Sequence, residues 1–174
     1  RRGSGSANTD IEGMAELRRQ LGVPISEHLN DPGELLRYRD AGAVDFANIA
    51  TCVNGIARTK FLFDYAHALG LRTLRGTTQE LSIGTAAAAH VMATLDSVDA
   101  PCDPAGPLLY VEDCTASPVK YEDSCLVVPE GPGLGIEVDE AHLETLAYTG
   151  ARLKQLRSRA PERPADARRS GSRH

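Results

Sequence analysis

The chain has 174 residues and a formal net charge of −5, with 41% hydrophobic and 25% charged residues, which is the composition of one soluble globular domain. No stretch approaches the roughly 18 consecutive apolar residues of a membrane-spanning helix, which argues against a membrane protein. The four cysteines form no Cys-x-x-Cys pair and lie near no histidine at zinc-ligand spacing, so we expect a reducing, cytoplasmic compartment.

Charge is divided unevenly along the chain. Residues 1–150 contain 11 Lys/Arg against 22 Asp/Glu, whereas residues 151–174 contain 8 against 2. An acidic body repels the phosphates on which nucleic-acid affinity depends, so no nucleic-acid partner is expected. The sequence predicts a flexible start over residues 1–9 and a disordered basic tail over residues 151–174, because neither stretch holds enough apolar residues for a core.

The first hundred residues alternate between helical and strand-like patterns. Apolar residues at helical spacing predict helices over about residues 10–20, 31–42, 56–69 and 83–95, and short apolar runs predict strands at 23–25, 44–49 and 71–74. Thr9 or Asp10 can cap the first helix, Asp31 with Pro32 begins the second, and Gly42 ends it. The second helix is expected to turn three side chains inward, Leu35, Leu36 and Tyr38.

This alternation, at about 22 to 27 residues per unit, is typical of a parallel sheet covered by helices. Such units close into a barrel or form a doubly wound sheet. After residue 100 the pattern changes to three short strand-like runs, 108–111, 119–121 and 126–128, and a final helix over 139–147. These runs predict a small β-rich appendage.

Polar residues that directly follow the strand-like runs are the candidates for chemistry, because active sites of such folds lie at the carboxyl ends of the strands. Glu27 and Glu80 occupy such positions and suit a hard divalent cation or acid/base work. His28, next to Glu27, is a candidate for substrate contact or proton transfer. The alternative is that both glutamates are exposed loop carboxylates.

Three segments resemble, in order, the carboxyl-terminal barrel half of the enolase superfamily, in its muconate-lactonizing enzyme and mandelate racemase branch. They are GVPISEHL, AGAVDFANIATCVNGIARTKFLFDYAHALGL and LRGTTQELSIGTAAAAH. The following stretch, GPLLYVEDCTASPVKYEDSCLVVPEGPGLGIEVDEAHLETLA, resembles the chain end of the muconate cycloisomerases. The resemblance covers about residues 10–148.

The resemblance implies an α/β fold, the C-terminal portion of a (β/α)₈ TIM-type barrel, with a small β-rich closing segment. The barrel part is expected over residues 10–100 and the closing segment over residues 101–150. The expected partners are a small carboxylate substrate and the amino-terminal half of the barrel with its lid domain. A homo-oligomer is expected for the full-length protein.

The chemistry implied is removal of the proton beside a carboxylate, with Mg²⁺ or Mn²⁺ stabilising the enediolate. Glu27 matches the place where dehydratases and mandelate racemases of the superfamily supply their third metal ligand, whereas cycloisomerases place an Asp at the position of Ser26. Glu80 matches the cycloisomerase glutamate that assists the enol oxygen or protonation.

The chain departs from the pattern after the sixth strand of such a barrel. Cycloisomerases carry a lysine base there, and this sequence has Ile49 or Ala50 in that slot. The resemblance favours the carboxyl-terminal part of an isomerase or cycloisomerase. An acid-sugar dehydratase of the same superfamily and a truncated, non-catalytic remnant remain as alternatives.

Overall fold

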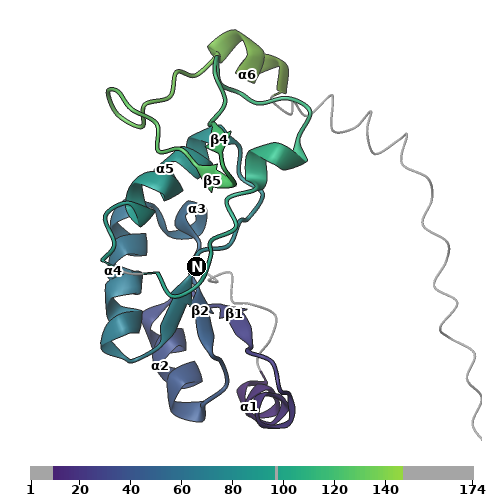
Figure 1. Cartoon of the computed structure of the whole chain (residues 1–174), viewed down its shortest axis with the longest axis vertical. Helices are drawn as coiled ribbons and strands as arrows, with labels where there is room; N and C mark the ends of the chain where they lie inside the picture. Colours follow the sequence, from purple (N-terminus) through teal and green to yellow (C-terminus); the bar gives the residue numbers. More distant parts are fainter. Residues whose placement is uncertain (1–9, 97, 147–174) are drawn as a thin grey trace, which may run out of the picture.

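The computed structural model describes residues 10–96 and 98–146. The predicted flexible start and the predicted basic tail lie outside the described residues. The molecule is elongated, with a helix-covered sheet at one end and the closing segment, here residues 101–146, at the other (Figure 1). No helix of the described residues is both long enough and apolar enough to cross a membrane.

Helices and strands alternate through the first part of the chain, as the sequence predicts. The element order is α1 (Ile11–Gln20), β1 (Ser26–His28), α2 (Pro32–Ala41), β2 (Phe46–Asn48), α3 (Thr51–Asn54), α4 (Ile56–Ala68), β3 (Arg72–Leu74), α5 (Ser82–Met92), the 3₁₀ helix η1 (Gly106–Leu109), β4 (Tyr121–Glu122), β5 (Cys125–Leu126) and α6 (Glu140–Leu146).

The predicted ends of the first two helices are confirmed. The Asp10 carboxylate accepts the Gly13 N–H at the start of α1, and the Asp31 carboxylate does the same for Gly33 at the start of α2. Gly42 ends α2 with φ +61°, a left-handed conformation that favours glycine. Of the three α2 side chains predicted to point inward, Leu35 and Tyr38 are buried, whereas Leu36 is 37% exposed and was wrongly predicted.

The three longer strands form one parallel sheet in the order β1-β2-β3, which confirms the predicted parallel pairing. The register aligns Glu27 with Ala47 and Thr73, and aligns His28 with Asn48 and Leu74. The first strand was predicted at residues 23–25 and lies three residues later, so the polar residues expected beyond its end form the strand itself. Closure of a barrel is not confirmed by these three strands.

One face of the sheet is covered by helices. The imidazole Nε2 of His67, on α4, lies 2.9 Å from the Thr73 hydroxyl, which places Thr73 on the helix-covered face. By the register, Ala47 and Glu27 share that face. The largest fully buried apolar side chains of the core it faces are Leu29, Leu35, Ile49, Leu62 and Phe63.

The opposite face of the sheet carries the alternate residues, because successive strand side chains point to opposite sides. We call it the open face. Phe46 and Arg72 are cross-strand neighbours on it, and the Arg72 guanidinium carbon lies 4.0 Å from the centroid of the Phe46 ring. Ser26 and His28 are exposed on the same face.

The chain returns to the sheet after α5. Asp99 N donates to Thr73 O at 3.1 Å and Asp103 N donates to Arg75 O at 3.0 Å, so residues 99–103 run beside β3. The Asp99 carboxylate also accepts the Thr73 N–H at 2.7 Å. The closing segment thereby begins at the edge of the sheet.

The closing segment differs from its prediction at its first element. Residues 108–111 were predicted as a strand, but Gly106–Leu109 forms a 3₁₀ helix, and Val111 beyond it is fully exposed. The other two predicted strands, 119–121 and 126–128, each share one residue with the short antiparallel pair β4-β5, which lies nearer the turn between them. The final predicted helix is α6, which ends the described chain.

Candidate functional site

The carboxyl ends of β1, β2 and β3 lie next to each other because the strands are parallel and adjacent. Two asparagines tie the segments that follow these ends. Asn30 Oδ1 accepts the Ala50 N–H at 3.0 Å and the Asn54 side-chain amide at 2.7 Å. Asn48 Oδ1 accepts the Gly76 N–H at 2.9 Å. The polar residues after the strands are thus held by side-chain contacts that the sequence reading missed.

Glu27 and His28 point to opposite faces of β1. Glu27 Oε1 accepts the His28 N–H at 3.0 Å, and the Glu27 side chain shares the helix-covered face with Ala47 and Thr73. His28 is exposed on the open face. The structure therefore turns only His28 of this pair toward the side that a barrel would enclose.

Glu80 lies in the loop between β3 and α5, where the sequence placed it. Its Oε2 accepts three hydrogen bonds, from the Thr78 N–H at 2.8 Å, the Thr78 hydroxyl at 3.0 Å and the Thr77 hydroxyl at 3.1 Å. The side chain is 7% exposed. Glu80 is thus a buried, oriented carboxylate and not an exposed loop residue.

Arg75 is the ion-pair partner of Glu80. Its Nη2 meets Glu80 Oε1, and the Arg75 side chain is 1% exposed. Burial lowers the pKa of the Arg75 guanidinium, although nearby polar groups oppose this effect. Arg75 was not among the predicted site residues, although a charged residue directly after an apolar strand and before Gly76 is a signal that the sequence offers.

Two further contacts shape the loop around Glu80. A Cβ on Gly106 would collide with the backbone carbonyl of Glu80, so the closing segment packs directly against the loop. On the other side, Cys52 Sγ contacts the hydroxyl of Thr78, whose N–H and hydroxyl both bind Glu80. The candidate site therefore brings together the loop after β3, Cys52 of α3 and the start of η1.

The family model described as Enolase C-terminal domain-like matches residues 6–142, more than three quarters of the chain. The chain belongs to the enolase C-terminal domain-like family.

Curated relatives of this enolase-type chain are muconate and chloromuconate cycloisomerases. A chloromuconate cycloisomerase of Cupriavidus pinatubonensis is 33% identical over 146 residues, which are 81% of this chain and 39% of the relative. Muconate cycloisomerase 1 of Rhodococcus opacus is 32% identical over 138 residues, 78% of this chain and 37% of the relative. The chain therefore spans less than half the length of these relatives.

Solved structures agree with the sequence comparison. The muconate lactonizing enzyme from Pseudomonas putida matches with a TM-score of 0.72 at 29% identity, over 78% of this chain and 39% of that one. A mandelate racemase/muconate lactonizing family protein from Azoarcus sp. EbN1 matches with a TM-score of 0.73 at 27% identity, over 82% of this chain and 41% of that one.

The slot of the cycloisomerase lysine holds apolar residues in this enolase-type chain. Ile49 is fully buried in the helix-covered core, and Ala50 is 1% exposed. Neither side chain can take up a proton, so the base that the resemblance implies is absent from this position.

The carboxylates of this enolase-type chain do not by themselves make a site for a divalent cation. Within residues 10–96 and 98–146, no three His, Cys, Asp or Glu side chains come together as a ligand set. Glu80 is already paired with Arg75, and Glu27 stands beside a histidine and a serine on β1. The assignment of Glu27 as a metal ligand remains a prediction.

Proposed function

We propose that this chain is the carboxyl-terminal barrel portion of an isomerase of the muconate cycloisomerase type, which acts on a small carboxylate by moving the proton beside it. The observation that carries the proposal is the Glu80 carboxylate, buried at the carboxyl end of β3 and fixed by three hydrogen bonds and by Arg75. The 33% identity to a chloromuconate cycloisomerase over most of the chain supports it.

In this proposal Glu80 acts on the oxygen of the enol that forms when the proton leaves. A carboxylate held by Thr77, Thr78 and Arg75 cannot turn away, so it is oriented before the reaction and needs little rearrangement during it. Burial strengthens the repulsion between an ionised Glu80 and negative charge on the enol oxygen, so a proton has to be shared between the two. For an enol to form, Glu80 would have to act first as the acid: it would give its proton to the substrate oxygen as the α-proton leaves, and take that proton back when the carbon is reprotonated.

His28 is the proposed proton carrier at the other end of the site. It is exposed on the open face of β1, at the carboxyl end of the strand. An imidazole ring can both take and give a proton, which suits a proton carrier. A base from the remainder of the barrel would take the place of the missing lysine.

A divalent cation is part of the proposal only through Glu27. Such an ion, when bound, would stabilise negative charge on the substrate carboxylate. Of the described residues the resemblance assigns it Glu27 alone, although that side chain lies on the helix-covered face, opposite His28, and further ligands would come from outside this chain. The described residues on their own do not fit the ion, so no step here is routed through it.

A non-catalytic remnant is the second candidate, and one observation favours it. Ile49 packs in the core where the base would stand, and Glu80 is neutralised by a buried arginine. In that case the chain would keep the family's fold for assembly without turning over a substrate.

The test is exchange of the substrate's α-hydrogen with deuterated water, followed by proton NMR for a panel of small carboxylates including muconolactone. We expect exchange in the complete protein that contains this chain, and a loss of about 100-fold or more in Glu80→Gln. Glu12→Gln, an exposed carboxylate in the first turn of α1, is the matched control and should behave as wild type. Equal rates in Glu80→Gln and wild type would refute the role of Glu80, and no exchange in any panel member would favour the remnant.

The cation is tested separately. EDTA should abolish exchange and Mg²⁺ should restore it, with Glu27→Gln requiring more Mg²⁺ than wild type because one anionic ligand is gone. His28→Asn should leave the Mg²⁺ requirement unchanged and alter the pH profile of exchange. An unchanged Mg²⁺ requirement in Glu27→Gln would remove Glu27 from the metal site.

A further inference from the structure

A cavity lined by Arg75 lies between α5 and the β4-β5 hairpin. Its volume is about 370 Å³, within the range of small-molecule sites. Ala89 and Met92 of α5 form one wall, and Leu126 of β5 forms another. Ser124 and Cys125, which are exposed, form its rim, so the cavity opens to solvent.

The only charged side chain among the residues that line this cavity is Arg75. The side chain is 1% exposed, and within the described residues its Nε and Nη1 have no hydrogen-bond partner. The ion pair with Glu80 is made through Nη2. A guanidinium has five N–H donors, and leaving them unpaired away from water is costly.

We propose that this cavity is a binding site for a small monocarboxylate with an apolar body. Its carboxylate would accept the unpaired N–H groups of Arg75, which offer the fork geometry that carboxylates bind. Its apolar body would lie against Ala89, Met92 and Leu126.

The charges around Arg75 favour a monoanion over a dianion. Glu80 pairs with the guanidinium from one side, and Asp103 also interacts with it electrostatically. A ligand with two negative charges, such as phosphate, would be repelled by Glu80 and Asp103, and the one positive charge of Arg75 would not compensate for this repulsion. A monocarboxylate with apolar carbon atoms matches the one charge and the lining.

This site is separate from the proposed isomerase chemistry. It lies between α5 and the hairpin, whereas Glu80 and His28 act at the strand ends. The two proposals share Arg75, which pairs with Glu80 and lines the cavity, but binding to the cavity can be measured whether or not the protein turns over a substrate.

The experiment is a calorimetric titration of the full chain with hexanoate, with benzoate and with inorganic phosphate. We expect saturable binding of at least one monocarboxylate and weaker or no binding of phosphate. Arg75→Met should weaken the carboxylate at least about tenfold, because charge-assisted hydrogen bonds are lost. Arg72→Met, the matched control three residues earlier in β3, should bind as wild type, since Arg72 lies over Phe46 and outside the cavity.

Two further variants keep the proposal testable if Arg75→Met fails to fold. Ala93→Phe places a ring into the cavity from the exposed end of α5 and should abolish binding without changing the Arg75–Glu80 pair. Glu80→Gln removes the competing carboxylate and should tighten binding several-fold.

The proposal is overturned if neither monocarboxylate binds the wild-type chain. It is also overturned if Arg75→Met or Ala93→Phe binds as wild type does. Phosphate binding as tightly as the carboxylates would show a general anion site instead. Failure of hydrogen exchange in the Glu80 experiment would leave these results unaffected.

Discussion

The helix-covered sheet and the closing segment are stabilised by different forces. In the first, Leu29, Leu35, Ile49, Leu62 and Phe63 are fully buried in one core. In the second, the buried apolar side chains are Cys114 and Val119, while four consecutive residues, 108–111, are exposed.

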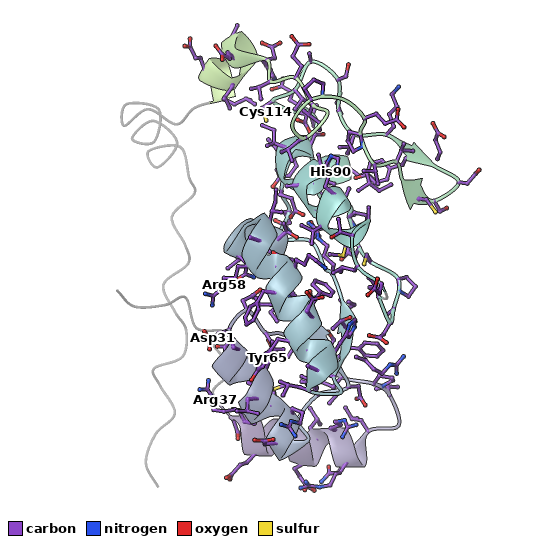
Figure 2. All side chains as sticks on the ribbon, turned by 90° about the vertical axis from the view of Figure 1, so that its left-hand side faces the viewer. Asp31, Arg37, Arg58, Tyr65, His90 and Cys114 are labelled. Carbon is purple, nitrogen blue, oxygen red and sulfur yellow. The ribbon has the colours of Figure 1, made fainter. Side chains whose placement is uncertain are left out.

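Polar contacts attach the closing segment instead. The Asp113 carboxylate accepts the Ser82 N–H at 2.9 Å and the Ser82 hydroxyl at 2.6 Å, at the start of α5. The Tyr110 hydroxyl donates to Gln79 O at 2.8 Å, and His90 on α5 lies 3.1 Å from Leu134 O (Figure 2). A mutation in the core of the helix-covered sheet should therefore unfold that region as a unit. A mutation at the attachment of the closing segment should release that segment locally.

The largest expected effect is in the first region. Phe63→Ala should lower the free energy of unfolding by about 3 to 5 kcal/mol, because it leaves a cavity where the ring was fully buried. Urea unfolding followed by circular dichroism measures it. Phe61→Ala, on the same helix but 51% exposed, is the control and should cost far less. Equal losses in both variants would contradict a core built on Phe63.

A smaller effect is expected at the attachment of the closing segment. Asp113→Ala removes both bonds to Ser82 and should cost about 1 to 3 kcal/mol, mostly by releasing residues 113–139. Amide hydrogen exchange by mass spectrometry should rise there and stay unchanged in α4. Faster exchange throughout α4 would show that the two regions unfold together.

The same attachment gives a pH dependence. Burial raises the pKa of the Asp113 carboxyl, but the hydrogen bonds from Ser82 and Thr115 outweigh burial and leave the pKa below its ordinary value of 3.8. The contribution of Asp113 is therefore complete above pH 3.8 and is lost as the pH falls through the lowered value. Protection of the Ser82 amide, followed by NMR from pH 5 downward, should fall in wild type and be flat in Asp113→Asn.

The smallest effect is expected at the surface ion pair between Asp31 and Arg58. Both side chains are about half exposed, and Arg58 Nη2 lies 3.3 Å from Asp31 Oδ2 (Figure 2). Arg58→Ala should change stability by no more than about 0.5 kcal/mol, since water screens such pairs. Asp31→Ala should cost more, because it also removes the cap of α2. A loss in Arg58→Ala that matches Phe63→Ala would break the distinction between core and surface.

The features that were predicted correctly from the sequence are those that depend on neighbouring residues alone, such as helix ends. Asp31, Pro32 and Gly42 define α2 through side-chain capping and a left-handed glycine, which need no information from elsewhere in the chain. The strand-like run at 108–111 was wrongly predicted as a strand because Pro107, in the first turn of η1, suits a helical start. Among residues 10–96 and 98–146, no neighbouring strand pairs with this run.

The candidate site was predictable in position but not in detail. Glu80 was found from its place after a strand and from the family resemblance, and the structure keeps it at the strand end. Arg75 as its partner, and the face on which Glu27 lies, depend on register and burial, which no single-sequence pattern reports. The roles of Glu27, His28 and Glu80 stay predictions.

Gly106 restricts how this protein can vary. The backbone of η1 lies so close to Glu80 that there is no room for even a methyl group. A library with position 106 randomised, selected for folded protein with residues 77–81 protected from proteolysis, should return glycine almost alone. The loop that orients a carboxylate thus depends on the one side chain that consists of a hydrogen atom.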